Sequence, residues 1–407
     1  MIDAISVRSS DEVAAAIQAA NAARAPVEIV AGGTKRGFGR PVQAARTLDM
    51  SALSGITMYE SDELVLSARA GTKLAEIRRA LEAQNQLLAF EPPDLGPLLG
   101  AGSALQTIGG VLACNLSGSR RIKAGAARDH FLGLSAVSGR GEQFKSGGRV
   151  MKNVTGYDLP KLLAGSFGTL AVMTDVTLKV LPAPEKTRTV LAYGLRDDAA
   201  IAAMSDALNS PYDVSGAAHL PPAIAARSAV DYVRTAGKSV TALRVEGPAK
   251  SVEARCAALR GMLSSRGPTE ELHRANSAAL WAEVTNAGPF VGDAARHVWR
   301  VSVPPSAGAR VAARVVAALR AEHYFDWGGG LIWLALPPAD DAGAVVLRAA
   351  LGDGGGHGTL VRAPAQVRAV VPVFQPAAPA LAALSARVKA AFDPLGILNP
   401  GRMTAGG

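Results

Sequence analysis

Cysteine is scarce in this chain of 407 residues, which contains only Cys114 and Cys256. The two lie far apart and form no CxxC pair, which argues against a disulfide framework and against a zinc or iron–sulfur site. So few cysteines fit a reducing compartment. The N-terminus also lacks the basic and then apolar layout of a signal peptide, so we expect a cytoplasmic protein.

The common nucleotide-binding and metal-binding patterns are missing as well. No GxxxxGK[ST] and no GxGxxG occurs, so a Walker site and a Rossmann site are both unsupported. The 6 histidines are scattered without HExxH or HxH, and no metal site is expected. Any dinucleotide must therefore be bound by another architecture.

Long runs of one charge are absent, although the formal net charge is +9. The longest basic cluster is Arg120-Arg121 with Lys123, and a basic, solvated surface is favoured over nucleic-acid binding. The charge permits peripheral contact with the anionic inner face of the plasma membrane. Residues 95–119 carry no charge and are long enough to span a bilayer, but their glycines and polar side chains favour a buried ligand loop.

Aromatic residues make up only 5 % of the chain, so we expect a core built mainly from Ala, Val and Leu. Hydrophobic residues make up 49 % and charged residues 19 %, which is typical of a globular protein. The length is sufficient for two or three domains.

The first part of the chain shows an α/β pattern. Residues 9–24 predict a helix in which Ser9 and Glu12 have capping-box spacing. Residues 27–30 predict a strand that enters a glycine-rich turn, which places a ligand loop at the carboxyl end of the strand. Further elements are expected at strands 48–50, 64–68, 134–137 and 170–180, at a helix around 74–81 capped by Thr72, and at a short helix capped by Asp158.

Pro182-Ala183-Pro184 indicates a domain boundary, after which the pattern changes. Strand-like runs at 189–193, 240–245, 298–303, 331–336 and 358–361 alternate with Ala/Arg-rich helices at 249–264 and 306–321. This pattern predicts an antiparallel sheet with helices on one face. A last helix is expected over 381–392, and no internal repeat is apparent.

Three glycine-rich segments could contact a ligand. Residues 31–37 offer backbone N–H groups, a hydroxyl and two cations, which suit a pyrophosphate, and an ordinary βα turn is an equally good reading. Residues 107–110 could approach a flat ligand or form a tight core turn, and 165–172 is a turn common in α/β proteins. His357 lies in a fourth glycine-rich loop, where an exposed histidine is the favoured reading.

In order along the chain, these segments resemble flavoproteins of the vanillyl-alcohol oxidase and p-cresol methylhydroxylase (PCMH) type. Among these, they are most similar to the FAD-binding accessory subunits of bacterial glycolate oxidases. The more specific pieces are residues 151–159 and the C-terminal Asn399-Pro400-Gly401-Arg402-Met403. The remaining matching residues are 31–37, 48–49, 68–72, 91–93, 107–110, 114–118, 120–121, 128–129, 132–133, 168–172 and 326–329.

The resemblance implies an α+β fold. A two-part PCMH-type FAD-binding domain is expected over 1–184, an α/β (ferredoxin-like) cap domain over 185–375, and a C-terminal segment over 376–407 that returns to the FAD domain. It implies FAD as the cofactor. The implied cofactor-binding residues are Ala31, Gly32, Gly33, Thr34, Lys35, Arg36, Gly37, Thr107, Ile108, Gly109, Gly110, Asn115, Gly118, Gly168 and Val172.

Two departures from the family pattern bear on catalysis. Catalytic relatives carry HxGDGNLH in the cap, whereas here Gly356-His357-Gly358-Thr359-Leu360 lacks the acidic residue and the last histidine, so no catalytic residue is assigned. The usual glutamate of the GSEGTLG turn is Phe167, and the 31–37 loop has no histidine for covalent attachment, which implies non-covalent FAD.

The resemblance implies a subunit of a glycolate oxidase complex that oxidises glycolate or D-lactate to the 2-oxo acid. Electrons would pass to an iron–sulfur subunit, because this chain has no cluster ligands, and a catalytic FAD-containing sister subunit is the other expected partner. Two alternatives stay open. One is a self-sufficient FAD dehydrogenase of another alcohol or sugar, and the other is a non-catalytic flavin-binding scaffold.

Overall fold

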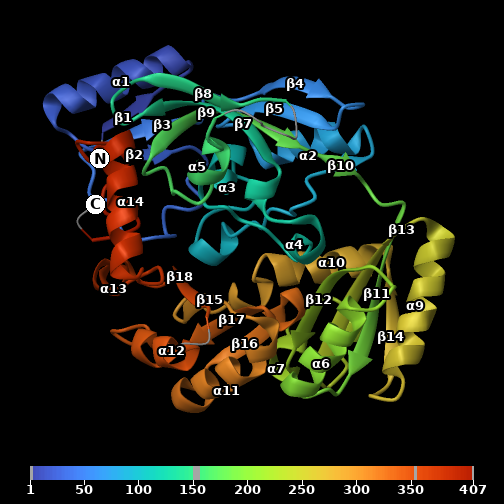
Figure 1. The fold of residues 1–407 in the computed structure, drawn as a ribbon. Helices are drawn as coiled ribbons and strands as arrows, with labels where there is room; N and C mark the ends of the chain where they lie inside the picture. The colour runs from blue at the N-terminus through green and yellow to red at the C-terminus, as the bar shows by residue number, and fades with distance from the viewer. Residues whose placement is uncertain (1–2, 150–155, 353–354, 406–407) are drawn as a thin grey trace. The chain divides into compact units, whose positions relative to one another are not determined.

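The computed structural model describes residues 3–149, 156–352 and 355–405, and the chain forms two compact units. Unit 1 comprises Met1–Ser117, Gly125–Ala183 and Pro376–Gly407, and unit 2 comprises Gly118–Ala124 and Pro184–Gln375. Each is described by itself (Figure 1). Residues 150–155, which include most of the 151–159 motif, lie outside the described ranges.

The first sheet of unit 1 is parallel and has the order β1-β3-β2. Its strands are β1 (Asp3–Ser6), β3 (Arg46–Asp49) and β2 (Val27–Val30). Helix α1 (Ser10–Ala23) connects β1 to β2 and begins as expected, because the Ser9 hydroxyl accepts a hydrogen bond from the Glu12 amide at 3.2 Å. The helix buries Val13 and Ile17 in the core beside this sheet.

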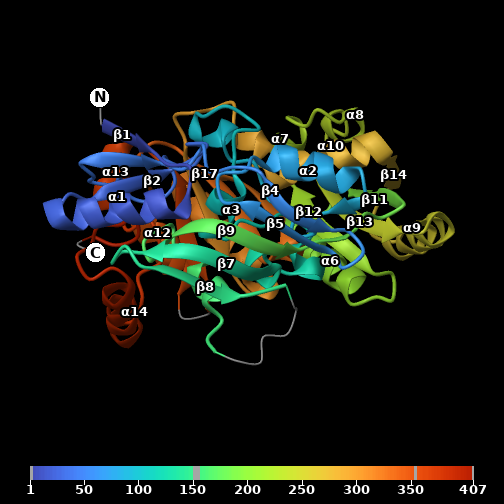
Figure 2. The same ribbon diagram turned by 90° about the horizontal axis from the view of Figure 1, so that it is seen from above.

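The second sheet of unit 1 is antiparallel, with the order β4-β5-β9-β7-β8 (Figure 2). Its strands are β4 (Ile56–Glu60), β5 (Val65–Arg69), β9 (Ala171–Lys179), β7 (Phe131–Ser138) and β8 (Gln143–Gly147). The central strand β9 carries the long alternating apolar pattern seen in the sequence, and its first residues are fully buried.

Short helices fill the connections of unit 1, namely α2 (Leu74–Glu82), α3 (Ile108–Ala113) and α5 (Leu159–Leu163). Asp158 caps α5 as expected, by accepting from the Lys161 amide at 3.3 Å. The prediction that Thr72 caps α2 is wrong. Its hydroxyl donates to the Arg69 carbonyl at 2.6 Å, because Thr72 closes the turn after β5.

The C-terminal segment of unit 1 joins the parallel sheet. Helix α14 (Pro379–Phe392) is followed by a chain segment in which Leu398 forms a parallel bridge with Val27 of β2. The Asn399 amide donates to the Val27 carbonyl at 3.0 Å. Ile29 of β2 and Asn399, which lie 370 positions apart in sequence, are therefore neighbours.

Unit 2 contains one antiparallel sheet with the order β14-β11-β13-β12-β16-β17-β15-β18. The strands of its first half are β11 (Lys186–Tyr193), β12 (Val214–Leu220), β13 (Val240–Gly247) and β14 (Thr269–His273). Those of its second half are β15 (His297–Ser302), β16 (Glu322–Asp326), β17 (Leu331–Leu336) and β18 (His357–Arg362).

The two halves of this sheet share one topology. Each runs β-α-β-β-α-β and places its strands in the order 4-1-3-2, and they meet where β12 pairs with β16. This is the split βαβ, ferredoxin-like arrangement. The expectation of no internal repeat is therefore wrong at the level of topology, because the halves share connectivity without evident sequence identity.

Helices cover both faces of this sheet rather than one. The connecting helices α6 (Asp197–Leu208), α9 (Ala249–Leu263), α11 (Gly308–Leu319) and α12 (Ala344–Leu351) pack on one face over a common core. Helix α10 (Arg274–Thr285) lies on the other, where its Trp281 indole donates to the Thr189 hydroxyl at 2.8 Å. Val190, the next residue of β11, belongs to the core under the connecting helices.

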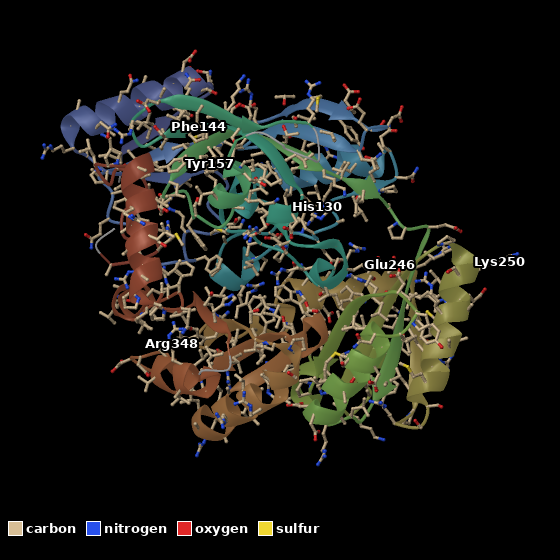
Figure 3. All side chains as sticks on the ribbon, viewed as in Figure 1. His130, Phe144, Tyr157, Glu246, Lys250 and Arg348 are labelled. Atoms are coloured by element: carbon tan, nitrogen blue, oxygen red, sulfur yellow. The ribbon has the colours of Figure 1, made fainter. Side chains whose placement is uncertain are left out.

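Segment 118–124 belongs to unit 2 although unit 1 surrounds it in sequence. The Arg120 guanidinium forms an ion pair with Glu246 of β13 at 2.6 Å (Glu246 is labelled in Figure 3). The Ser119 hydroxyl donates to the Asp326 carboxylate at 2.7 Å, and the Trp327 indole donates to the Gly118 carbonyl at 3.0 Å. These bonds fix the segment on the sheet.

Within the described ranges, no helix has both the length and the apolar character needed to cross a bilayer. The uncharged stretch of residues 95–119 contains one α-helix, the short α3. A buried ligand loop was expected here rather than a membrane span, and the rest of the stretch consists of turns and one short 3-10 helix (Pro97–Leu99).

Candidate cofactor site

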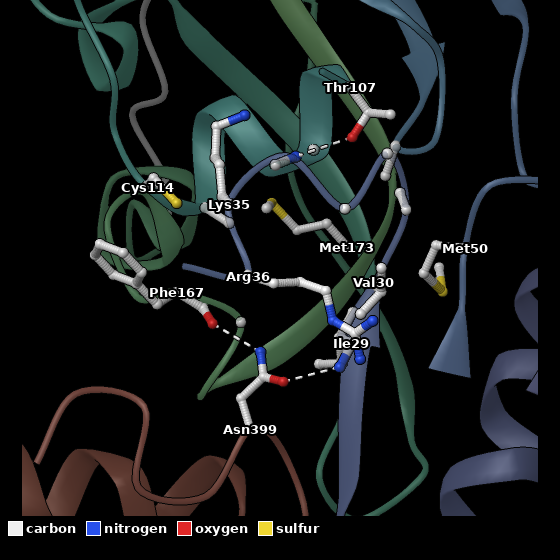
Figure 4. Close-up of a pocket in the computed structure, with 18 of the residues that line it drawn as sticks. Ile29, Val30, Lys35, Arg36, Met50, Thr107, Cys114, Phe167, Met173 and Asn399 are labelled. Atoms are coloured by element: carbon white, nitrogen blue, oxygen red, sulfur yellow. Dashed lines mark hydrogen bonds between the residues drawn. The ribbon is translucent and has the colours of Figure 1, made fainter. Parts of the chain in front are cut away.

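A pocket opens in unit 1 (Figure 4). It is lined by the end of β2, the following loop, α3, the start of β9 and the C-terminal segment. The lining residues are Ile29, Val30, Ala31, Gly32, Gly33, Thr34, Lys35, Arg36, Phe38, Met50, Ala70, Thr107, Gly109, Gly110, Ala113, Cys114, Phe167, Gly168, Ala171, Val172, Met173, Asn399 and Arg402.

The loop after β2 presents unused backbone donors. Among the described residues, the amides of Gly32, Gly33, Thr34 and Lys35 have no hydrogen-bond acceptor. Gly33 has φ +67°, and a Cβ on Gly32 would lie 1.8 Å from the Leu105 carbonyl oxygen. Glycine is thus required for this path of the chain, and successive free N–H groups of this kind favour an anion.

The charged residues that line the pocket are Lys35, Arg36 and Arg402, and the lining contains no carboxylate. The Lys35 ammonium donates to the Thr34 hydroxyl at 3.3 Å and forms no ion pair with a described residue. Burial lowers the pKa of Lys35, and Cys114 and Asp94 only partly oppose that shift. A bound anion would offset the cost of burying this charge.

Arg402, from the C-terminal segment, determines the shape of the loop. Its guanidinium donates to the carbonyl oxygens of Arg36 and Phe38 at 3.0 and 3.1 Å and to the Glu28 carboxylate at 3.0 Å. Glu28 also accepts from the Arg36 side chain, with Nε at 3.2 Å. Arg402 is 5 % exposed, so these bonds are shielded from water. The loop is therefore tied down by a residue 366 positions later in the chain.

Asn399 connects two walls of the pocket. Its side-chain oxygen accepts from the Ile29 amide at 2.8 Å, and its side-chain nitrogen donates to the Phe167 carbonyl at 2.8 Å (dashed in Figure 4). Phe167 and Gly168 both have positive φ, and a Cβ on Gly168 would lie 2.8 Å from the Asn399 nitrogen. The turn before β9 is thereby held beside the end of β2.

Helix α3 forms another wall. Thr107 is its N-cap and accepts from the Gly110 amide at 3.4 Å. A Cβ on Gly109 would lie 2.8 Å from the Ala70 carbonyl oxygen, so the helix can approach the turn after β5 only with glycine there. At the end of α3, burial raises the pKa of the Cys114 thiol to about 11, against opposing effects of Lys35 and Arg402. The thiol is therefore protonated at neutral pH.

The remaining lining is apolar and includes Met50, Ala171, Val172 and Met173. The Phe167 and Phe38 rings pack edge to face, with their centroids 5.1 Å apart. One side of the pocket thus offers cations and unpaired loop amides, and the other offers aliphatic and thioether groups. This combination suits a ligand that has a charged linkage and a flat, mostly apolar ring.

Of the fifteen residues predicted to bind the cofactor, eleven line this pocket. These are Ala31, Gly32, Gly33, Thr34, Lys35, Arg36, Thr107, Gly109, Gly110, Gly168 and Val172. Gly37, Ile108, Asn115 and Gly118 do not line the pocket. The Ile108 side chain is buried in the core, the Asn115 side chain accepts from the Arg128 amide at 3.1 Å, and Gly118 belongs to unit 2.

Most pocket residues that were not predicted flank the predicted segments, and four come from elsewhere in the chain, namely Met50, Ala70, Asn399 and Arg402. Asn399 and Arg402 lie in the C-terminal motif that helped to define the resemblance, and this motif was the available signal for their presence. Met50 follows β3 and Met173 lies within β9, and neither carries a local signature, whereas Cys114 follows α3 in the matching segment 114–118. In unit 2, His357 is exposed at the start of β18, and no group of metal-ligating side chains occurs among the described residues.

An amide-rich loop after a parallel strand, together with cations and an apolar wall, defines a protein that binds a large anionic cofactor. A family model described as an FAD binding domain matches residues 4–147. A crystal structure of p-cresol methylhydroxylase is similar with a TM-score of 0.71 at 15% identity, covering 98% of this chain and 88% of that chain, which shows the shared fold.

Over nearly its full length, the chain is similar to the glycolate oxidase subunit GlcE of Escherichia coli (strain K12). The two are 31% identical over 390 residues, which cover 94% of this chain and 93% of that protein. The glycolate oxidase subunit GlcD of Bacillus subtilis (strain 168) is 29% identical over 255 residues, and the match spans about half of its length (52%). The chain belongs to the GlcE family of FAD-linked oxidoreductases. The predicted family, the α+β PCMH-type fold and FAD as the cofactor are confirmed.

Proposed function

We propose that this chain is the FAD-binding subunit of a complex that oxidises glycolate, or D-lactate, to the 2-oxo acid. The observation that supports this proposal is the near full-length similarity to GlcE together with a pocket whose donors fit FAD. The proposed partners are an FAD-containing catalytic sister subunit and an iron–sulfur subunit that receives the electrons.

The residues of the pocket fit FAD on three grounds: unpaired loop amides, glycines that no Cβ could replace, and cations without a lining carboxylate. In this proposal the 31–37 loop and Lys35 hold the pyrophosphate. Thr107, Gly109, Gly110, Gly168 and Val172 contact the flavin and adenosine parts. When bound, FAD supplies a two-electron acceptor for a hydride.

The binding is proposed to be non-covalent. The 31–37 loop has no histidine, and the Cys114 thiol is protonated at neutral pH because burial raises its pKa to about 11. A thiol is a weak nucleophile in that form. If the protein is precipitated with acid, flavin should therefore stay in the supernatant, and flavin that remained in the pellet would contradict this part of the proposal.

A scaffold role is the second candidate, favoured by the incomplete cap motif around His357 and its exposed position. The decisive experiment is an anaerobic titration of the purified, FAD-loaded chain with glycolate or D-lactate, followed by flavin absorbance. Bleaching of the chain alone would defeat the scaffold role. Bleaching only after the sister subunit is added would support the complex, and a folded chain that takes up no FAD would defeat both candidates.

A further inference from the structure

Unit 2 contains an arginine, Arg300, that forms no ion pair with a described residue. Arg300 lies on β15 between Trp299 and Val301, whose side chains pack in the core under the connecting helices. Because side chains alternate along a strand, Arg300 points to the other face of the sheet. Among the described residues, its guanidinium has neither a hydrogen-bond acceptor nor an ion-pair partner. Side chains of this kind are rarely withdrawn from water unless they are paired.

A second guanidinium lies close to the first. The Arg121 and Arg300 guanidinium carbons lie over the Trp327 ring, at 4.4 and 4.8 Å from its centroid. Trp327 is buried, so it presents a fixed aromatic surface between the sheet and segment 118–124. Burial first, and then repulsion by Arg121, lowers the pKa of Arg300 to about 10. The free protein thus keeps two like charges together at a cost in stability.

The Asp326 carboxylate beside this cluster is already engaged. Asp326 is buried and accepts from the Ser119 hydroxyl and from the Trp327 amide, both at 2.7 Å. It forms no ion pair with Arg300. Attraction to Asp326 offsets only part of the shift that burial and Arg121 impose on the pKa of Arg300. Among the described residues, no carboxylate therefore neutralises Arg300 through a direct ion pair.

A neutral hydrogen-bonding group is present on the same side. His357 begins β18, next to β15, where Thr359 pairs with Arg300. Although His357 is exposed by surface area, partial desolvation and then repulsion by Arg300 and Arg121 lower the pKa of its imidazole, which favours the neutral form. A neutral imidazole can donate or accept a hydrogen bond beside the two cations.

We propose that Arg300, with Arg121 beside it over Trp327, binds the carboxylate of a short 2-hydroxy acid. The planar fork of a guanidinium matches the two oxygens of a carboxylate, and such pairs are the strongest hydrogen bonds that proteins form. The inference rests on the proposed function for the identity of the acid. It assigns the carboxylate-binding role to β15 in a chain whose cap lacks the family's histidine-rich motif.

The test uses the full-length, FAD-loaded protein and oxalate, a two-carbon acid that the flavin cannot oxidise by hydride transfer. Oxalate is titrated by calorimetry into the wild type, Arg300→Gln and Arg300→Lys. Loss of a charge-assisted pair predicts a fall in affinity of about 10- to 100-fold for Arg300→Gln. Arg300→Lys keeps the charge without the fork and should fall between. Arg314→Gln, an exposed position on α11, is the matched control and should bind like the wild type.

Thermal unfolding separates a binding role from a structural one. Among the described residues Arg300 forms no ion pair, and its replacement exchanges one cation–π contact for relief of the repulsion by Arg121, so Arg300→Gln without oxalate should melt near or above the wild-type temperature. Oxalate should raise the melting temperature of the wild type and of Arg314→Gln but not of Arg300→Gln. A destabilised Arg300→Gln protein with unchanged oxalate affinity would overturn the assignment, as would a wild type that binds inorganic phosphate but not oxalate.

The proposed function and this site can fail separately. If oxalate binds through Arg300 but glycolate never reduces the flavin, even with the sister subunit, the site stands and the proposed function fails. If glycolate reduces the flavin while Arg300→Gln leaves both the KM for glycolate and the inhibition by oxalate unchanged, the site fails and the proposed function stands.

Discussion

Replacing Arg402 by methionine tests whether the C-terminal segment shapes the cofactor loop. The change removes three hydrogen bonds, to the Arg36 and Phe38 carbonyls and to the Glu28 carboxylate, all between 3.0 and 3.1 Å. Hydrogen bonds to charged groups contribute about 1.5–3 kcal/mol each, but Glu28 keeps the Arg36 side chain as a partner. We therefore expect a loss of about 2–4 kcal/mol in the free energy of unfolding, less than the full cost of orphaning a buried charge.

The same change should weaken FAD binding. The amides of residues 32–35 can converge on a phosphate only while the loop keeps its shape, and a less ordered loop must be ordered at the moment of binding. We expect the Kd for FAD to rise about 10- to 100-fold, equivalent to about 1.4–2.8 kcal/mol. Flavin fluorescence on titration of the apoprotein measures the Kd, and urea unfolding measures the stability.

Two further variants make this prediction specific. Arg387→Gln removes an exposed guanidinium from α14 and should change neither measurement. Adding Glu28→Gln to Arg402→Met removes the carboxylate that the first change left with one partner, so part of the lost stability should return while FAD stays weakly bound. If Arg402→Met binds FAD with the wild-type Kd, the reasoning about the loop is refuted.

Three other outcomes follow from the structure. Gly32→Ala should give folded protein with little flavin, because its Cβ would lie 1.8 Å from the Leu105 carbonyl oxygen, and a normal flavin-to-protein ratio would contradict this. Although burial alone would raise it, Arg244 and then Arg120 hold the pKa of Glu246 down to about 2. This pKa lies below the value of about 4.3 expected in the unfolded chain, so ionised Glu246 stabilises the folded state above that pH, and this stabilisation is lost as the pH falls towards 2. Glu246→Gln should therefore make the free energy of unfolding less dependent on pH over this range. Cys114, with its pKa raised to about 11, should react slowly with iodoacetamide at pH 8 compared with unfolded protein, as mass spectrometry can measure.

Local patterns predicted much of the fold. Helix α1 follows from the Ser9 cap and the spacing of Val13 and Ile17, and β2 follows from an apolar run that ends in glycine. Strand β12 was not predicted. All of its residues are buried, so its sequence shows no alternation of apolar and polar residues. Its small residues are equally compatible with a helix or a loop. Thr72 was assigned as a cap from its position alone, although its hydroxyl is used by the preceding turn.

The candidate site was predictable only where it is local. The 31–37 loop and the 107–110 turn are recognisable in the sequence by their glycines. At Gly32 and Gly109 a side chain would collide with neighbouring backbone, so glycine is required there. The bonds of Asn399 and Arg402 depend on tertiary closure over more than 360 residues, for which no spacing rule exists. The sequence shows the motif that contains them. Only the structure shows its physical role, because there the Glu28 carboxylate accepts hydrogen bonds from both the Arg36 and the Arg402 guanidinium.

The closure of the pocket by the C-terminal segment has a thermodynamic consequence. Leu398 and Asn399 extend the edge of β2, and Arg402 holds the loop that follows it, so the amides of that loop are organised only when the C-terminal segment is docked. An anion that binds those amides must then favour the docked segment by the same free energy by which docking favours the anion. If the loop amides bind the cofactor as proposed, cofactor binding and C-terminal docking are therefore one linked equilibrium. A short motif near the C-terminus and a glycine-rich loop near the N-terminus thus form one structural unit, joined by the Arg402 and Asn399 hydrogen bonds.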